Sequence, residues 1–258
     1  MKIGLIGNGA IAGFARKEIE KRGHTIAVIL LRPERVAQNP DLHVGSVRDF
    51  PHDLDLVIDC AGHTALASHG PDILKRGVDL VTVSLGALAD PVVYSALMSA
   101  AQQGGSRLHL ASGAIGALDC LQAARIGALN SVTYVGRKPP QGWKGSPAQD
   151  HLDLDAMRHG AEVHFEGSAR EAALAYPKNA NVAAAVALAG IGFDETKVQL
   201  IADADVSANI HEIEATGDFG SLRFQITGRA LADNPRSSAL AAMSVVSKIE
   251  QLSQPIGF

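Results

Sequence analysis

Met1-Lys2-Ile3-Gly4-Leu5-Ile6-Gly7-Asn8-Gly9-Ala10-Ile11-Ala12-Gly13 is the stretch that decides the fold. Its apolar residues 3–6 predict a buried strand, and a helical pattern begins at Ala12. Gly7 permits a tight turn, Gly9 has no Cβ to obstruct a pyrophosphate, and Ala12 lets the helix pack closely on the strand. The free N–H groups at a helix start also favour phosphate charge. The stretch therefore predicts a dinucleotide site that includes Gly7, Gly9, Ala10 and Ile11. A tight turn without a ligand is the alternative.

Size and composition indicate a globular protein of one or two domains. The chain has 258 residues, of which 47% are hydrophobic and 19% charged. A net charge of −4 gives no electrostatic footprint for nucleic acid or a membrane surface. Cys60 and Cys120 are far apart and form no CxxC, which argues against a disulfide framework or a zinc site. We expect no secretory signal and no membrane span, and therefore a cytoplasmic protein.

Strand and helix patterns alternate through the first half of the chain. Apolar runs predict strands at 3–6, 25–31, 54–60, 79–84 and 107–111, and helical patterns occupy 12–21, 63–76 and 91–103. Repeated strand–helix units of this length predict a parallel sheet that is covered by helices on both faces. We expect an α/β fold with a Rossmann-type doubly wound parallel sheet.

The pattern changes after Ser112, where we expect a smaller α+β sheet domain. Helices are predicted at 117–128 and 183–189, strands at 131–137, 198–204, 209–216 and 221–227, and a hairpin turn at 217–220. The segment 139–147 is expected to be a loop. Asn234 as N-cap and Pro235 at the first helical position predict a final helix over 235–251. The expected domains are 1–112, with 234–258 packing back on it, and 113–233.

The end of the second predicted strand bears on the coenzyme. An acidic residue there would bind the ribose of NAD, whereas basic residues suit the 2′-phosphate of NADP. Here the strand tip lacks an acidic residue, and Arg32 and Arg35 flank it. NADP use or dual use is one interpretation, and two solvated surface arginines are the other.

Three loops of small residues follow predicted strands, at 60–63, 84–87 and 112–116. Small residues let backbone amides approach a flat nicotinamide ring, so Cys60 and Ala61 are candidate coenzyme contacts. Short loops between strands and helices are often glycine-rich without any ligand, which is the alternative. Cys60 is better interpreted as a small apolar residue than as a nucleophile, because no partner that would stabilise a thiolate is evident.

Motifs of the second half carry a resemblance that covers nearly the whole chain in order. Residues 111–119, 176–184, 211–215, 217–220 and 234–240 resemble the L-aspartate dehydrogenase family. The resemblance implies NAD- or NADP-dependent oxidation of L-aspartate to iminoaspartate, and the reverse reductive amination. Iminoaspartate can feed NAD biosynthesis or hydrolyse to oxaloacetate and ammonia. The resemblance also implies a homodimer formed through the smaller sheet domain.

The resemblance assigns roles residue by residue. His211 takes the family's catalytic position, and Ala114 and Asn181 take coenzyme-contact positions. A histidine near its unperturbed pKa of about 6.5 can accept or relay a proton close to neutral pH. The two substrate carboxylates need donors. The candidates are Ser112, Lys178 and the start of the final helix at Ser237 and Ser238, although each could equally be a cap or a surface group.

Two other functions fit parts of the pattern. A homoserine-dehydrogenase-like reductase shares the two-domain design, and with a catalytic lysine it would make His211→Ala mild and Lys178→Ala severe. A nucleotide-sensing binding protein would bind NAD(P)H without turning over any amino acid. Such a sensor has no need of a proton-transfer group, so the His211 motif argues against it.

Overall fold

The computed structural model describes residues 1–36, 39, 41–177, 179–232 and 234–256. The chain divides into two compact units, namely Met1–Ala87 with Pro91–Gly113 and Ala241–Phe258 as unit 1, and Leu88–Asp90 with Ala114–Leu240 as unit 2. The expected domain boundaries lay after 112 and before 234. In the structure they lie after 113 and before 241, and residues 88–90 belong to unit 2.

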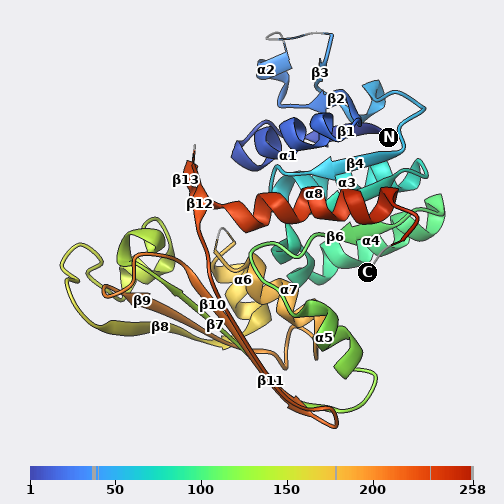
Figure 1. Cartoon of the computed structure of the whole chain (residues 1–258). Helices are drawn as coiled ribbons and strands as arrows, with labels where there is room; N and C mark the ends of the chain where they lie inside the picture. The colour runs from blue at the N-terminus through green and yellow to red at the C-terminus, as the bar shows by residue number, and fades with distance from the viewer. Residues whose placement is uncertain (37–38, 40, 178, 233, 257–258) are drawn as a thin grey trace. The chain divides into compact units, whose positions relative to one another are not determined.

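Unit 1 is built on a six-stranded parallel sheet with the strand order β3-β2-β1-β4-β5-β6 (Figure 1). Its strands are β1 (Lys2–Ile6), β2 (Thr25–Leu30), β3 (His43–Val44), β4 (Leu56–Asp59), β5 (Asp79–Thr82) and β6 (Leu108–Leu110). The order reverses between β1 and β4, where doubly wound folds bind ligands at the carboxyl ends of their strands. The predicted doubly wound parallel sheet is confirmed.

Helices cover both faces of this sheet. They are α1 (Ala10–Lys21), α3 (His63–Lys75), α4 (Pro91–Gly104) and most of α8 (Ala239–Ser253), with a short α2 (Pro33–Val36) after β2. Residues of α1 and α8 share a core with the face that carries Val81. The neighbouring Leu80 faces the other way and lies against α3, where a Cβ at Gly70 would be 3.4 Å from it and 2.7 Å from Leu97 of α4.

The final helix begins later than predicted, which corrects the expected helix over 235–251. Residues 234–238 instead form β13 (Asn234–Ser238), which pairs antiparallel with β12 (Ala230–Leu231), and α8 starts at Ala239. The pairing gives backbone N–H and C=O groups of β13 hydrogen-bond partners in β12, in place of the partners that a helix would provide. Proline is tolerated in an edge strand because the missing N–H is not needed for pairing there. Ser237 and Ser238 therefore end a strand directly before α8, so the predicted helix start at 235 is wrong, while both serines stay candidates for the substrate.

Unit 2 contains a five-stranded mixed sheet in the order β11-β10-β7-β9-β8 (Figure 1). Its strands are β7 (Leu129–Lys138), β8 (Ala161–Ser168), β9 (Lys197–Asp203), β10 (Ile210–Gly217) and β11 (Gly220–Thr227). The pair β7–β9 is parallel and the others are antiparallel. The predicted hairpin is confirmed, because Gly217 pairs with Gly220, whose φ of +108° suits only glycine.

The helices that lie wholly within the described residues of unit 2 are α5 (Leu118–Ala124), α6 (Ala169–Ala175) and α7 (Asn181–Ala189). α7 is buried along most of its length because its alanines allow close packing. The predicted helix over 117–128 is shorter than expected, and the predicted loop over 139–147 contains the 3₁₀ turn Pro140–Trp143. No helix in the described ranges is long and apolar enough to cross a membrane.

Candidate active site

The turn after β1 provides an open cradle for phosphate. Gly7 has a φ of +94°, and a Cβ on it would lie 3.0 Å from the Cβ of Ala61. Gly9 is the N-cap of α1, and a Cβ there would meet no atom within 4 Å. No side chain in the described part of the chain caps this helix, and its first turn holds no acidic residue, so N–H groups of Ala10 and Ile11 remain for an anion. These residues fit the pyrophosphate of a dinucleotide.

The residues at the tip of β2 lie where the adenosine ribose of such a coenzyme would be bound. Arg32 is exposed between the buried Leu31 and α2, and Arg35 is exposed within α2. The only acidic residue of this turn, Glu34, belongs to α2 and does not lie at the strand tip. The arginines are therefore placed where a 2′-phosphate could be bound.

A buried carboxylate that was not predicted from the sequence lies beneath the loops after β4 and β5. Asp59 is 0% exposed, and its Oδ2 accepts hydrogen bonds from Thr82 Oγ1 at 2.8 Å and Ser84 Oγ at 2.6 Å. Its Oδ1 accepts the N–H of Ala61 at 3.0 Å. Burial raises the pKa of Asp59, while the three donors oppose this shift. An aspartate that ends an apolar strand was the available signal.

The predicted coenzyme contacts near these loops differ in exposure. Cys60 is half-buried and Ala61 is exposed. Burial raises the pKa of the Cys60 thiol above its ordinary value, so this residue stays an uncharged thiol. Ser112 is half-buried in unit 1, whereas Ala114 is buried and is the first residue of the main part of unit 2. Between them, the N–H of Gly113 donates to Ser244 Oγ at 3.0 Å.

His211 is buried in the sheet of unit 2. Its side chain is 4% exposed, and its Nδ1 lies 2.8 Å from the hydroxyl of Tyr134 on β7. Gly136 is paired with His211 across the two strands, and a Cβ at Gly136 would lie 2.7 Å from that hydroxyl. The glycine therefore provides the space through which Tyr134 reaches the imidazole.

Burial sets the protonation state of this pair. It lowers the pKa of His211 to about 3, and the charge of Lys138 contributes in the same direction. The expectation that His211 has a pKa near the unperturbed value is therefore wrong. Burial also raises the pKa of Tyr134. At neutral pH the imidazole is uncharged and the phenol is protonated.

A second buried group, Lys138, was missed from the sequence. It lies at the end of β7 and is 8% exposed. Its Nζ donates to Asn179 Oδ1 at 2.8 Å and lies 4.6 Å from the ring centroid of Trp143. Burial lowers the pKa of Lys138 to about 8. The alternation of inward residues along 132–138 was a signal for it, because Lys138 has the same parity as Tyr134 and Gly136.

The other predicted residues of unit 2 are placed as follows. Asn181 is the first residue of α7, whose N-cap is Ala180. Lys178 lies outside the described residues. Ser237 and Ser238 are half-buried in β13. Unit 2 therefore joins His211 and Tyr134 in one buried pair, with Lys138 near enough for its charge to act on the histidine.

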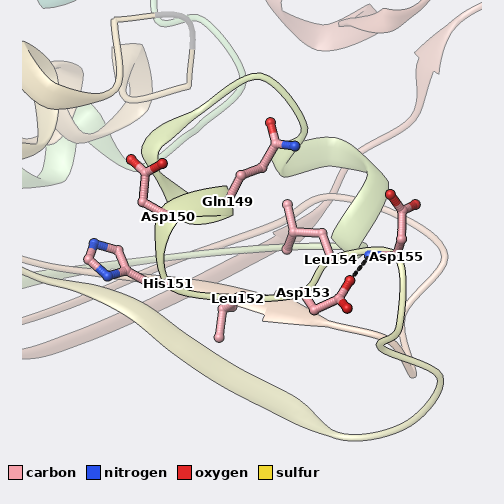
Figure 2. A pocket seen from close by; sticks show the side chains of 7 residues that line it. All are labelled: Gln149, Asp150, His151, Leu152, Asp153, Leu154 and Asp155. Carbon is pink, nitrogen blue, oxygen red and sulfur yellow. Dashed lines mark hydrogen bonds between the residues drawn. The ribbon is translucent and has the colours of Figure 1, made fainter.

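Residues 149–155 of unit 2 line a polar hollow of about 440 Å³, and Figure 2 shows their side chains. Asp153 Oδ1 accepts the N–H of Asp155 there at 3.1 Å. The lining contains none of the predicted site residues that the structure describes, and it includes neither His211, Tyr134 nor Lys138.

Comparison with known proteins identifies the family. Residues 119–252 match the family model described as aspartate dehydrogenase, C-terminal. An L-aspartate dehydrogenase of Ruegeria pomeroyi is 52% identical over 255 residues, which cover 97% of this chain and 92% of that protein. The chain belongs to the L-aspartate dehydrogenase family. A second member, from Cupriavidus necator, is 42% identical over 255 residues and is covered to 95%, as is this chain.

Family members also share the fold. The crystal structure of aspartate dehydrogenase from Thermotoga maritima superposes with a TM-score of 0.78 at 28% identity, covering 100% of this chain and 99% of that one. Residues 3–111 match a different description, homoserine dehydrogenase, NAD binding domain. The first half of this aspartate dehydrogenase family member thus carries an NAD-binding domain of a type that is not confined to the family.

Proposed function

We propose that this chain catalyses the NAD(P)-dependent oxidation of L-aspartate to iminoaspartate, with His211 as the base and Lys138 as the cation for a substrate carboxylate. The observation that carries the assignment of roles is the buried His211–Tyr134 pair under the influence of the Lys138 charge. Family membership supports the reaction, since the similar curated relatives are named L-aspartate dehydrogenases.

The reaction needs a base at the substrate nitrogen. The amine of aspartate is an ammonium at neutral pH, and it must lose a proton before the nitrogen lone pair can form the C=N bond. His211 is uncharged and can take that proton. Because Tyr134 engages Nδ1, the free nitrogen is Nε2, and Nδ1–H then donates to the phenol oxygen. When bound, NAD(P) supplies the hydride acceptor.

Lys138 supplies the positive charge that a dicarboxylic substrate requires. A desolvated ammonium gains more from a carboxylate than a solvated one does, and Asn179 and Trp143 hold this ammonium in place. Burial is the larger cause of the low pKa of His211 and the Lys138 charge is the smaller one, which a bound carboxylate would offset. Substrate binding would therefore make the histidine a stronger base.

Most of the proposed coenzyme contacts belong to unit 1. The start of α1 would hold the pyrophosphate through the N–H groups at Gly9, Ala10 and Ile11. Arg32 supports use of NADP as well as NAD, since a guanidinium binds a phosphate in bidentate fashion. Cys60, Ala61, Ala114 and Asn181 stay candidates for contacts with the coenzyme, and Ser112 stays a candidate for the substrate.

We also propose that the protein is a cytoplasmic homodimer. The two cysteines are free thiols, which suits a reducing compartment. One face of the unit 2 sheet carries the exposed Arg223 and Glu214, 3.4 Å apart, with the half-buried Glu212 3.5 Å from Arg223, and a second copy could pair on this face. Sedimentation should give about twice the chain mass of 26.9 kDa, and a single-chain mass would contradict the dimer.

The test of function is the appearance of reduced nicotinamide absorbance with purified protein. L-aspartate would be supplied with NAD and with NADP in parallel, and D-aspartate, L-glutamate and L-homoserine would serve as controls. Turnover with L-aspartate alone is expected. Turnover with homoserine would favour the reaction suggested by the match of residues 3–111, and coenzyme binding without turnover would indicate a sensor.

A further inference from the structure

The buried carboxylate of unit 1 has no part in the chemistry assigned above, yet it joins two loops at the carboxyl edge of the sheet. Asp59 is the last residue of β4, and its donors Thr82 and Ser84 lie at the end of β5 and just beyond it. The N–H of Ser84 in turn donates to Thr82 Oγ1 at 2.9 Å. One carboxylate thus ties the chain as it leaves both strands.

The same carboxylate reaches the turn after β1 through Ala61. Asp59 Oδ1 accepts the N–H of Ala61, and the Cβ of Ala61 lies against the turn residue Gly7, where any added Cβ would be 3.0 Å away. The N–H of Cys60 also donates to the carbonyl of Ile6 at 3.1 Å. The loops after β1, β4 and β5 are therefore one connected structure with Asp59 at its centre.

The loops that Asp59 connects lie at the edge of the sheet where a dinucleotide would bind. The start of α1 and the tip of β2 account for the pyrophosphate and the adenosine ribose of a dinucleotide. The sheet order reverses between β1 and β4. A dinucleotide whose adenosine half lies at β2 therefore extends its other half across the ends of β4 and β5. The loops after these two strands would therefore receive the nicotinamide half.

We propose that Asp59 is a positioning residue that holds the loops after β4 and β5 in the arrangement that receives the nicotinamide half of the coenzyme. The inference rests on the proposed function, because it assumes NAD(P) binding. Asp59 itself is fully buried and is covered by the groups that donate to it. It acts through Ala61 and Ser84, and it does not need to touch the coenzyme.

The structure offers a matched pair of serines for the test. Ser84 is 3% exposed and donates to Asp59 at 2.6 Å at the carboxyl edge of the sheet. Ser106 is 8% exposed and donates to the carbonyl of Leu74 at 2.7 Å. Ser106 precedes β6, so it lies at the opposite, amino edge. Each serine-to-alanine change removes one buried hydroxyl donor from the same unit.

The experiment measures coenzyme dissociation constants by NADH and NADPH fluorescence, together with thermal unfolding midpoints. ADP-ribose is used as a competitor against NADH, and 2′-phospho-ADP-ribose against NADPH. The Kd of each competitor measures binding to the part of the site that does not contact nicotinamide. Ser84→Ala should raise the Kd of the reduced coenzyme about five- to tenfold and leave that of ADP-ribose within about twofold. Ser106→Ala should lower the unfolding midpoint without changing either constant.

Variants of Asp59 itself test the centre of the network. Asp59→Asn keeps an acceptor for Ala61 and can donate to the two hydroxyls, so it should bind NADH more tightly than Asp59→Ala does. Equal Kd values for wild type and Ser84→Ala would overturn the inference. So would parallel losses of NADH and ADP-ribose affinity in Ser84→Ala, because that result indicates a general structural role. If wild type bound neither reduced coenzyme, the proposed function would fail, and this inference with it.

Discussion

At the scale of single residues, burial sets the charge states on which the proposed chemistry depends. His211 and Lys138 occupy the same unit and are both nearly inaccessible to solvent. Removal from water favours the uncharged form of each group, which makes the histidine a neutral base and lowers the pKa of the lysine to about 8. A pattern of residue types indicates which groups are present, but their pKa values depend on the folded surroundings.

The pKa of Lys138 predicts how substrate binding depends on pH. The protonated amine binds a carboxylate, so affinity should be full below pH 8 and should be lost as the pH rises through about 8. Succinate as a competitive inhibitor isolates this effect, because it has two carboxylates and no amine of its own. Its inhibition constant should rise above pH 8 in wild type.

Substitution of Lys138 should remove both the affinity and its pH dependence. Lys138→Met should raise the inhibition constant of succinate about thirtyfold at pH 7 and make it independent of pH near 8. Lys144→Met is the control, because Lys144 lies six residues further along, is partly exposed and pairs with Asp155. An unchanged pH profile in Lys138→Met would show that another group binds the carboxylate.

The hydroxyl of Tyr134 should matter for rate because it orients His211. Tyr134→Phe removes the partner of Nδ1 and should lower kcat about tenfold, with a smaller effect on the KM for aspartate. Tyr176→Phe is the matched control, since Tyr176 contacts another buried histidine, His164, at 3.2 Å. Equal kcat values for the two variants would argue against a positioning role for Tyr134.

At the scale of elements, strong local patterns were predictable and weak ones were not. β1, α1, β2 and the hairpin between β10 and β11 follow the sequence patterns closely, because buried runs and glycine turns fix them. β8 was missed because it is largely exposed and carries a register shift, which obscures its alternation. α6 was missed although a capping box of Ser168 and Glu171 begins it.

Other errors came from signals that fit two structures. Asn234-Pro235 can begin a helix, but the pairing of Ala230 with Ser238 holds this segment as a strand until Ala239. Lys138 fell between the predicted strand over 131–137 and the predicted loop over 139–147, although its backbone ends β7. Asp59 looked like an ordinary strand residue, because the sequence does not show that β4 and β5 are neighbours. Tertiary pairing decided each case.

The turn between β2 and α2 carries a prediction about coenzyme choice. Arg32→Ser removes the guanidinium that would bind a 2′-phosphate, so kcat/KM for NADP should fall at least about tenfold. The value for NAD should change less than about twofold, which makes it the internal control. Initial rates at several concentrations of each coenzyme give both values. If the two coenzymes lost activity equally, Arg32 would have no role in reading the phosphate.

At the scale of the whole molecule, the first half of the chain indicates the coenzyme and the second half indicates the substrate. Residues 3–111 could be predicted to bind a dinucleotide, yet they match a homoserine dehydrogenase NAD-binding domain and so do not specify the substrate. Residues 119–252 match the aspartate dehydrogenase family and contain His211, Tyr134 and Lys138. The motifs of the second half were therefore needed to predict the reaction from sequence.

Buried histidines should make the folded molecule sensitive to mild acid. Burial lowers the pKa of His211 to about 3 and that of His164 to about 4, whereas both titrate near 6.5 when unfolded. The unfolded chain therefore binds more protons between about pH 4 and 6.5, and stability falls as the pH falls through this window. Unfolding midpoints at pH 7.5, 6.0 and 5.0 should decrease in order, and His164→Phe should reduce the slope. A flat profile would contradict the buried neutral state.

The central claim is that His211 is the general base. The most direct test replaces each of two buried histidines of unit 2, His211 and His164, by asparagine. His211 and His164 each have Nδ1 next to a tyrosine hydroxyl, at 2.8 Å and 3.2 Å. The measurement is kcat for L-aspartate oxidation at saturating coenzyme. His211→Asn should lower kcat about a hundredfold or more, as loss of a general base does, while His164→Asn stays within about threefold of wild type. Equal kcat values for the two variants would contradict the assignment of His211 as the base.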